Sequence, residues 1–188
     1  GNQMVDYALS QVPQGNYLLL WGDANDANAR FIRQGIEETL KPHVANGSVN
    51  ILYSQHVEDY STAGTKNALQ KVYDFTSMPI DAILCGSGAM AEAVINLLEE
   101  IKYPRKVVVT GQDLTLATSK LIYQGRQDMS VNKSVKELAY KAIEVAIDLA
   151  HSSKIDKKEI NKLVNNGRGE VPAILLPPTP VTKQNLRE

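Results

Sequence analysis

The chain has 188 residues, of which 43% are hydrophobic and 22% charged, a balance typical of a soluble globular protein. This length indicates one domain or slightly more and is enough to bury a substantial core. The formal net charge is −1, so there is no basic surface to hold a phosphate backbone, and we expect no nucleic-acid binding. The apolar runs are too short to cross a membrane.

The first residue, Gly1, lies in helix-like composition and is not a Met, so we expect a piece of a longer protein, from which targeting cannot be read. Cys85 is the single cysteine and cannot form an internal disulfide. Because it ends the apolar run Ala82–Cys85, we expect a small core residue rather than a nucleophile.

Apolar runs typical of buried strands alternate with segments that have helical periodicity. The predicted strands are Tyr17–Trp21, Val49–Tyr53, Ile80–Cys85, Lys106–Val109 and Met129–Val131. In the helical segments apolar residues recur three and four positions apart, as at Ile32, Ile36 and Leu40. The alternation predicts an α/β fold, with a doubly wound parallel sheet flanked by helices.

The composition changes after the long helical segment that ends near Leu149. Residues 152–162 are polar and charged, and the sequence NNGRG at Asn165–Gly169 is typical of a turn. The apolar run Val171–Leu176 follows, with prolines within it and after it. A strand bracketed by prolines suits a crossover or hinge better than the centre of a sheet.

Polar side chains follow four of the predicted strands at their C-terminal ends. They are Asp23, Asn25, Asp26, Asn28 and Arg30 after the first, Ser87 after the third, Gln112 and Asp113 after the fourth, and Asn132 and Lys133 after the fifth. The C-terminal ends of parallel strands share one edge of the sheet, where ligands bind. Carboxylates, amides and a lysine together suit a polyol, because each sugar hydroxyl both donates and accepts hydrogen bonds.

Each of these residues also has an ordinary structural interpretation, and the residues alone favour neither. Asp26 or Asn28 could simply cap the helix that follows, while Asp113 and Lys133 could be a cap and a surface charge. Tyr60, in a polar segment, could stack on the apolar face of a sugar or be a loop aromatic.

Signatures of catalysis are missing from the sequence. There is no phosphate-binding loop motif and no G-x-S-x-G elbow. The histidines, His43, His56 and His151, do not have the spacing of metal ligands. Asp23 and Asp26 are not accompanied by the rest of a calcium loop. We therefore expect no enzyme activity, no metal site and no cofactor.

Three segments resemble the xylose-binding branch of type I periplasmic sugar-binding proteins. They are QGNYLLLWGDANDANARFIRQGIEETLKPHV, TGQDLTLATSKLIYQGRQDMSVNKSVKELA and LVNNGRGEVPAILLPPTPVTKQNL. The resemblance implies a non-enzymatic, extracytoplasmic protein of two lobes that close on a monosaccharide such as D-xylose. It places residues 1–170 in the C-terminal lobe and residues 171–188 in a hinge crossover and tail toward an N-terminal lobe.

The same resemblance implies both a set of partners and a set of ligand-binding residues. The partners are the N-terminal lobe and either the permease of an ABC importer or the extracellular domain of a sensor kinase, with a lipoprotein as one form of membrane attachment. The implied sugar-contacting residues are Asp26, Asn28, Tyr60, Ser87, Asp113 and Lys133. Where the family has Asn-Asp after the third strand, this chain has Ser87-Gly88, which predicts a change in affinity or specificity.

Two other classes of function fit the same fold. The first is the effector-binding domain of a sugar-responsive transcription regulator, which would need a DNA-binding segment before residue 1. The second is a small α/β enzyme, against which the missing nucleophile, base and metal signatures argue.

Overall fold

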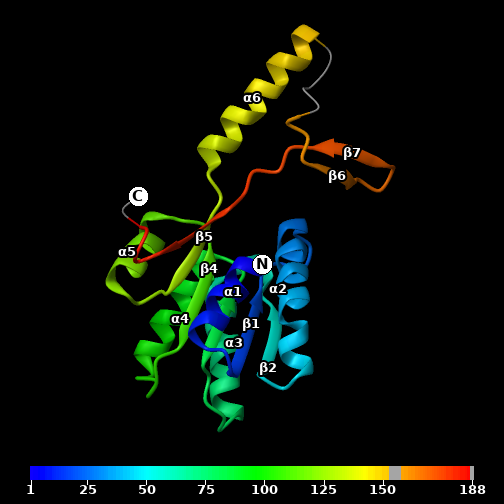
Figure 1. Cartoon of the computed structure of the whole chain (residues 1–188). Coiled ribbons are helices and arrows are strands. Elements are labelled where there is room, and N and C mark those ends of the chain that lie inside the picture. The colour runs from blue at the N-terminus through cyan, green and yellow to red at the C-terminus, as the bar shows by residue number, and fades with distance from the viewer. Residues whose placement is uncertain (153–157, 187–188) are drawn as a thin grey trace. The chain divides into compact units, whose positions relative to one another are not determined.

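The computed structural model describes residues 1–152 and 158–186, and Figure 1 shows the course of the chain. Internal packing divides the chain into two units. The first comprises Gly1–Asn132 and the segment that starts at Pro180, and the second is Lys133–Thr179. The resemblance instead divides the chain between residues 170 and 171, and that division stays a prediction. Residues 153–157, 187 and 188 lie outside the described residues.

The first unit is built on a mostly parallel sheet, which confirms the predicted fold class. Its strands are β1 (Gly15–Trp21), β2 (Val49–His56), β3 (Ala82–Cys85), β4 (Val108–Gln112), β5 (Met129–Asn132) and β8 (Thr179–Thr182). The order in the sheet is β2-β1-β3-β4-β5-β8, and β1 to β5 all pair in parallel. The strand order reverses between β1 and β3, which is the switch point where open α/β sheets bind ligands.

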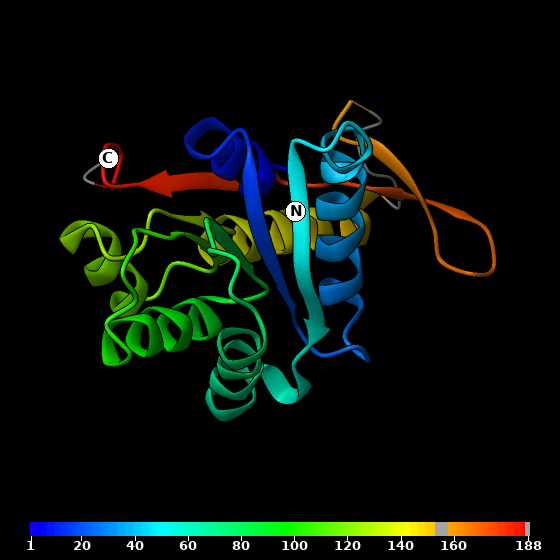
Figure 2. The same ribbon diagram turned by 90° about the horizontal axis from the view of Figure 1, so that it is seen from below.

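Helices cover both faces of this sheet (Figures 1 and 2). They are α1 (Asn2–Gln11), α2 (Ala27–Ala45), α3 (Thr62–Phe75), α4 (Gly88–Glu100) and α5 (Leu116–Gln124), with the short 3-10 helix η1 (Glu58–Tyr60) before α3. Successive side chains of β1 point alternately to the two helical layers. Tyr17 and Leu19 pack in one apolar cluster with α1 and α2, whereas Leu18 and Leu20 pack in the other with α3 and α4.

The second unit consists of α6 (Val135–Ser152) and a hairpin of β6 (Lys162–Asn165) and β7 (Glu170–Ala173). The hairpin turn is at the NNGRG segment, as predicted, and Gly167 has a φ of +87° there. One face of α6, with Leu138 and Val145, lines a shallow cavity of about 230 Å³ together with residues 172–176. None of the helices in the described residues is long and apolar enough to span a membrane.

Three element boundaries differ from those expected, each for a local reason. β4 continues to Gln112 because the buried side chain of Gln112 donates to the Gly86 carbonyl at 3.0 Å. α3 begins at Thr62, inside residues 55–64, which the polar composition predicts as a loop, because the Ser61 hydroxyl caps the helix. β8 contains Pro180 and was not predicted as a strand. It lies at the sheet edge, where a proline is tolerated.

The central strand should carry much of the stability of the chain. Leu20 is fully buried between β1 and the α3–α4 layer, whereas Leu116, in the first turn of α5, is 73% exposed. We expect Leu20→Ala to lower the free energy of unfolding by about 2–5 kcal/mol, since it removes buried contacts and leaves a cavity. Leu116→Ala should change it by less than about 0.5 kcal/mol. Urea denaturation measures both, and equal effects would contradict this assignment of the core.

Candidate functional site

Three loops meet at the C-terminal ends of β1, β3 and β4. The Gly86 N–H donates to the Leu20 carbonyl at 2.8 Å, which holds the end of β3 beside the end of β1. A Cβ at Gly86 would lie 2.5 Å from the Gly22 nitrogen, so the two backbones touch and no side chain fits between them. The loops that follow β1 and β3 are therefore fixed against each other by backbone contact.

The end of β4 is attached to the same place from the other side. The Gln112 side chain bonds Gly86, and a Cβ at Gly88 would lie 3.1 Å from the Gln112 carbonyl oxygen and 2.7 Å from Thr118 Oγ1. Gly88 thus has a packing reason to be glycine, which bears on the Ser87-Gly88 departure from the family's Asn-Asp. An aspartate at position 88 would require the Thr118 side chain to move and would fit tightly against the end of β4.

Asp113 is the first residue after β4, and its conformation is unusual. Its φ is +71°, in the left-handed region that non-glycine residues rarely adopt. Its N–H donates to the Val131 carbonyl at 2.8 Å, and its own carbonyl accepts the Ser130 hydroxyl at 2.9 Å. Two contacts with β5 therefore hold the backbone that carries the exposed Asp113 side chain.

The loop after β1, residues 22–26, is ordered by its own side chains. One oxygen of Asp23 accepts the Asn25 N–H at 2.8 Å, and Arg30 donates to the carbonyls of Ala24 and Asn25 at 3.2 and 3.1 Å. Asp26 caps α2 by accepting the Asn28 N–H at 2.8 Å. The capping interpretation of Asp26 is thus confirmed, but it uses only one of the two carboxylate oxygens.

Tyr60 connects the loop after β2 to this first loop. Its hydroxyl donates to the second oxygen of Asp26 at 2.5 Å. Its ring lies against Gly22, where a Cβ would come within 2.0 Å of Tyr60 Cε1. The structure therefore brings together two of the predicted site residues, Asp26 and Tyr60, across 34 positions of sequence.

These contacts perturb the acid–base properties of the loop. Hydrogen bonds from backbone N–H groups, that of Asp59 first, hold the pKa of Asp23 below its usual value. The Tyr60 hydroxyl, followed by the Asn28 N–H, does the same for the pKa of Asp26. Burial and then the bond to Asp26 raise the pKa of Tyr60, and the charge of Asp113 acts in the same direction. Asp23 and Asp26 are therefore carboxylates at neutral pH, and Tyr60 is a neutral donor.

The other predicted residues occupy the expected ends of their strands. Ser87 caps α4, with its hydroxyl accepting the Met90 N–H at 3.2 Å, and its own O–H can still donate. Asn28 is exposed in the first turn of α2. Lys133 directly follows β5 and is the first residue of the second unit. Whether these residues contact a ligand stays a prediction.

Sequence reasoning missed a group that supports the first loop from beneath. His56 Nδ1 lies 2.7 Å from the Gly22 carbonyl oxygen, and Arg33 Nη1 lies 3.0 Å from His56 Nε2. A carbonyl only accepts and a guanidinium only donates, so the proton of His56 is on Nδ1. The Arg33 guanidinium also lies 5.5 Å from the centre of the Trp21 ring. The polar His56 at the end of β2 was the one signal available in the sequence.

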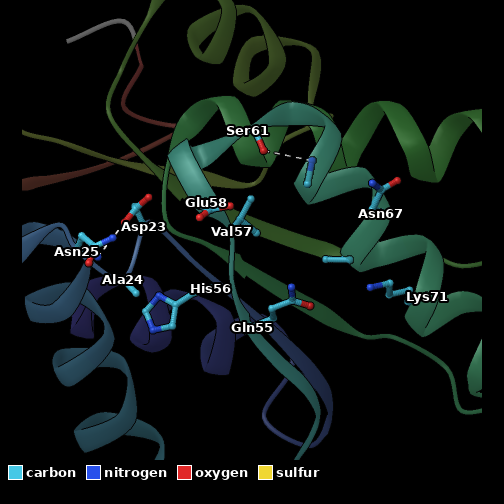
Figure 3. Close-up of a pocket in the computed structure, with 12 residues that line it drawn as sticks. Asp23, Ala24, Asn25, Gln55, His56, Val57, Glu58, Ser61, Asn67 and Lys71 are labelled. Carbon is cyan, nitrogen blue, oxygen red and sulfur yellow. Dashed lines mark hydrogen bonds between the residues drawn. The ribbon is translucent and has the colours of Figure 1, made fainter.

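A cavity of about 490 Å³ lies beside these loops, between the end of β2 and α3 (Figure 3). Asp23 and Asn25 line it from the first loop, His56 from β2, and Asn67 and Lys71 from α3. Asp23 is shared with the loops described above, but Asp26, Tyr60, Ser87 and Asp113 do not line this cavity. These four predicted residues therefore lie outside this cavity.

Within residues 1–152 and 158–186, no group of three or more His, Cys, Asp or Glu side chains is placed to hold a metal ion. Cys85 is fully buried, which confirms the core interpretation, and burial raises the pKa of its thiol.

Comparison with known proteins agrees with this fold. Residues 1–154 match the family described as periplasmic binding protein domain. The D-xylose-binding periplasmic proteins of Haemophilus influenzae and Escherichia coli K12 are 35% and 33% identical, over 94% of this chain and 52% and 53% of theirs. A carbohydrate transporter solute-binding protein from Chloroflexus aurantiacus, solved with D-glucose, is 28% identical with a TM-score of 0.87, over 99% of this chain and 62% of that one.

The chain belongs to the periplasmic binding protein family, and the expected resemblance to the xylose branch of its type I sugar-binding members is confirmed. These proteins are solute receptors, which confirms the expectation that the chain is not an enzyme. The chain spans about half the length of the two curated relatives.

Proposed function

We propose that the chain is the C-terminal lobe, together with the final crossover, of an extracytoplasmic receptor that binds a monosaccharide, with D-xylose as the first candidate. The observation that carries this proposal is the convergence of Asp26, Tyr60, Ser87 and Asp113 on one edge of the sheet, next to the switch point between β1 and β3. Carboxylates that are already ionised, beside neutral hydroxyl donors, match the alternating donors and acceptors of a sugar.

The proposed ligands divide by chemical role. Asp26 and Asp113 accept hydrogen bonds from sugar hydroxyls, and Lys133 donates to their oxygens. Asn28 and Ser87 can do both. Tyr60 belongs to the same set, although its ring is placed against Gly22 and its hydroxyl on Asp26. The hydroxyl of Ser87 is shorter than an asparagine side chain, so at this position we expect either a different sugar substituent or a bridging water.

The second unit supports a second lobe outside this chain. Tyr140, Ile143 and Ile147 recur on one face of α6 and are 64%, 58% and 50% exposed. An apolar helix face of this kind is normally covered by protein. Because the chain is about half as long as its curated relatives, we infer that the N-terminal lobe of the intact protein covers this face.

In the mechanism we propose, sugar binds first to the open edge and the two lobes then close over it about a hinge. The closed form is what a membrane partner recognises, either the permease of an ABC importer or the extracellular domain of a sensor kinase. Sugar-dependent cross-linking of the intact protein in membranes distinguishes these partners from each other. Cross-links that are the same with and without sugar would contradict recognition of the closed form.

The proposal predicts binding without turnover. In calorimetric titration of the intact protein with D-xylose, D-ribose, L-arabinose, D-glucose and D-galactose, we expect one sugar to bind with a Kd in the micromolar range or tighter. D-glucose belongs in this panel because the solved Chloroflexus aurantiacus neighbour holds it. Consumption of any of these sugars, or binding of none, would refute the proposed function.

Two substitutions of Asp113 separate the effect of its charge on sugar binding from the effect of its left-handed backbone conformation. Asn tolerates a φ of +71° about as well as Asp, so Asp113→Asn removes the charge and little else. We expect it to weaken sugar binding at least about tenfold, because charge-assisted hydrogen bonds are roughly twice as strong as neutral ones. Asp113→Ala should abolish binding and also cost about 1 kcal/mol of stability through the left-handed backbone.

Calorimetry gives the affinities and thermal unfolding the stabilities of both variants. Lys133→Met should weaken binding with an unchanged Tm, and Asp74→Asn, at the far end of α3, is the control. Unchanged affinity in Asp113→Asn would remove Asp113 from the site.

The apolar face of α6 gives a prediction about stability. Ile143→Ser should lower the free energy of unfolding of the intact protein by about 1–3 kcal/mol, because it removes a buried side chain from the contact between lobes. In the 188-residue chain alone the same substitution should have an effect below about 0.5 kcal/mol, since Ile143 is exposed there. Equal effects in the two proteins, measured by urea denaturation, would contradict a lobe packed on this face.

A further inference from the structure

The loop after β2 has a backbone that its own sequence does not favour. Asp59 and Tyr60 are consecutive non-glycine residues with positive φ values, +51° and +52°. Such residues persist where surrounding contacts hold them, and they concentrate at ligand-binding loops. We therefore expect the contacts that hold this pair to have a functional role as well as a structural one.

The carboxylate of Asp23 joins the loops after β1 and β2. Its Oδ1 accepts the Asn25 N–H at 2.8 Å within the first loop, and its Oδ2 accepts the Asp59 N–H at 3.0 Å in the second. Each oxygen serves a different loop, so the two acceptor oxygens of the carboxylate make both bonds at once. Asp23 is thereby committed to holding the turn that presents Tyr60.

Tyr60 in turn restricts the carboxylate of Asp26. Asp26 Oδ1 accepts the Asn28 N–H at 2.8 Å, and Oδ2 accepts the Tyr60 hydroxyl at 2.5 Å. Rotation of this carboxylate would break both bonds. Each carboxylate oxygen has a second lone pair, so one acceptor position on each oxygen stays open for a ligand.

We propose that Asp23 and Tyr60 are positioning residues that form a latch across the two loops and aim the Asp26 carboxylate at the sugar. The latch consists of Asp23, Asp59, Tyr60 and Asp26. The proposal rests on the proposed function, because it assigns to Asp26 a sugar hydroxyl as its remaining partner. A carboxylate fixed before binding loses less freedom when the sugar arrives, so the latch should raise affinity.

This role differs from stacking of the Tyr60 ring on a sugar face. The phenol end of the ring fills the space beside Gly22, where an added Cβ would lie 2.0 Å from Cε1 and 2.4 Å from Cζ. Gly22 does not have a φ in the left-handed region, so its backbone does not require glycine. The reason for glycine at position 22 is therefore the space that Tyr60 occupies.

Two conservative variants of the intact protein test the latch. Tyr60→Phe keeps the ring and removes the bond to Asp26, while Asp23→Asn keeps the size but leaves one acceptor oxygen for two N–H donors. With the sugar that the wild type binds best, we expect each variant to raise the Kd about tenfold at pH 7. Tyr73→Phe and Asp74→Asn, near the C-terminal end of α3, are matched controls and should stay within about twofold.

A second measurement needs no sugar. The Tyr60 hydroxyl is the main cause that keeps the pKa of Asp26 low, and Asn28 and Arg30 act in the same direction while the charge of Asp23 opposes them. Tyr60→Phe should therefore raise the pKa of Asp26, seen by NMR of its carboxyl carbon in the ligand-free protein. Sugar binding by this variant should also be lost at a higher pH on acidification, because Asp26 is protonated sooner.

Gly22→Ala provides a variant that displaces the ring without changing any latch residue. We expect it to reproduce the weaker binding and the raised Asp26 pKa of Tyr60→Phe. If the wild type binds a sugar and Tyr60→Phe and Asp23→Asn both bind it equally well, the latch is wrong. An Asp26 pKa unchanged in Tyr60→Phe would also overturn it. A wild type that binds none of the sugars would refute the proposed function, whereas the NMR titration would still report on the latch.

Discussion

The site depends on the close approach of backbones at the C-terminal end of the sheet. A Cβ at Gly86 would lie 2.5 Å from the Gly22 nitrogen, and a Cβ at Gly88 would lie 3.1 Å from the Gln112 carbonyl oxygen, so these two glycines allow the ends of β1, β3 and β4 to approach closely. The buried Gln112 side chain then ties the end of β4 to Gly86. These contacts fix the backbone at the ends of the strands, from which the polar residues follow. The rigid sheet, rather than the loops, therefore sets the positions of the candidate ligand-binding residues.

The same edge gathers negative charge, and the positive charge of Arg30 helps to keep the pKa of Asp26 low. The carboxylates of Asp23 and Asp26 are stabilised by N–H and O–H donors, which keep their pKa values low. This arrangement suits a neutral ligand rich in hydroxyl groups, since the acceptors are charged before the ligand arrives and need not lose a proton. The charge of Asp113 also acts on Tyr60, which is why we treat these loops as one electrostatic unit.

The sequence predicted the sheet, its helices and the edge that carries the polar residues, because strand and helix periodicities in this chain are clear and parallel strands end at a common edge. It did not predict the bond between Tyr60 and Asp26, since those residues lie 34 positions apart and meet through left-handed backbone at Asp59 and Tyr60. It also missed β8, because Pro180 argues against a strand. Only the structure shows that this segment pairs with β5 at the edge of the sheet, where proline is tolerated.

Asp26 illustrates how two interpretations that compete in the sequence can both describe one residue. It caps α2 with one oxygen and meets Tyr60 with the other, so the capping role does not exclude a ligand. Ser87 is similar, because its hydroxyl accepts from Met90 and can still donate. A strand that ends in a helix cap places a polar side chain at the edge of the sheet for structural reasons, and a binding site can use that same side chain.

The most direct test of the central claim is a map of backbone amide shifts in the NMR spectrum of the intact protein when D-xylose or the sugar it prefers is added. The account predicts that within this chain the largest shifts occur at Gly22–Asn28, at Ser87 and at Asp113. Shifts concentrated at the opposite end of the strands, around the cavity that Pro79, Tyr103 and Arg105 line, would place the ligand elsewhere and contradict the account.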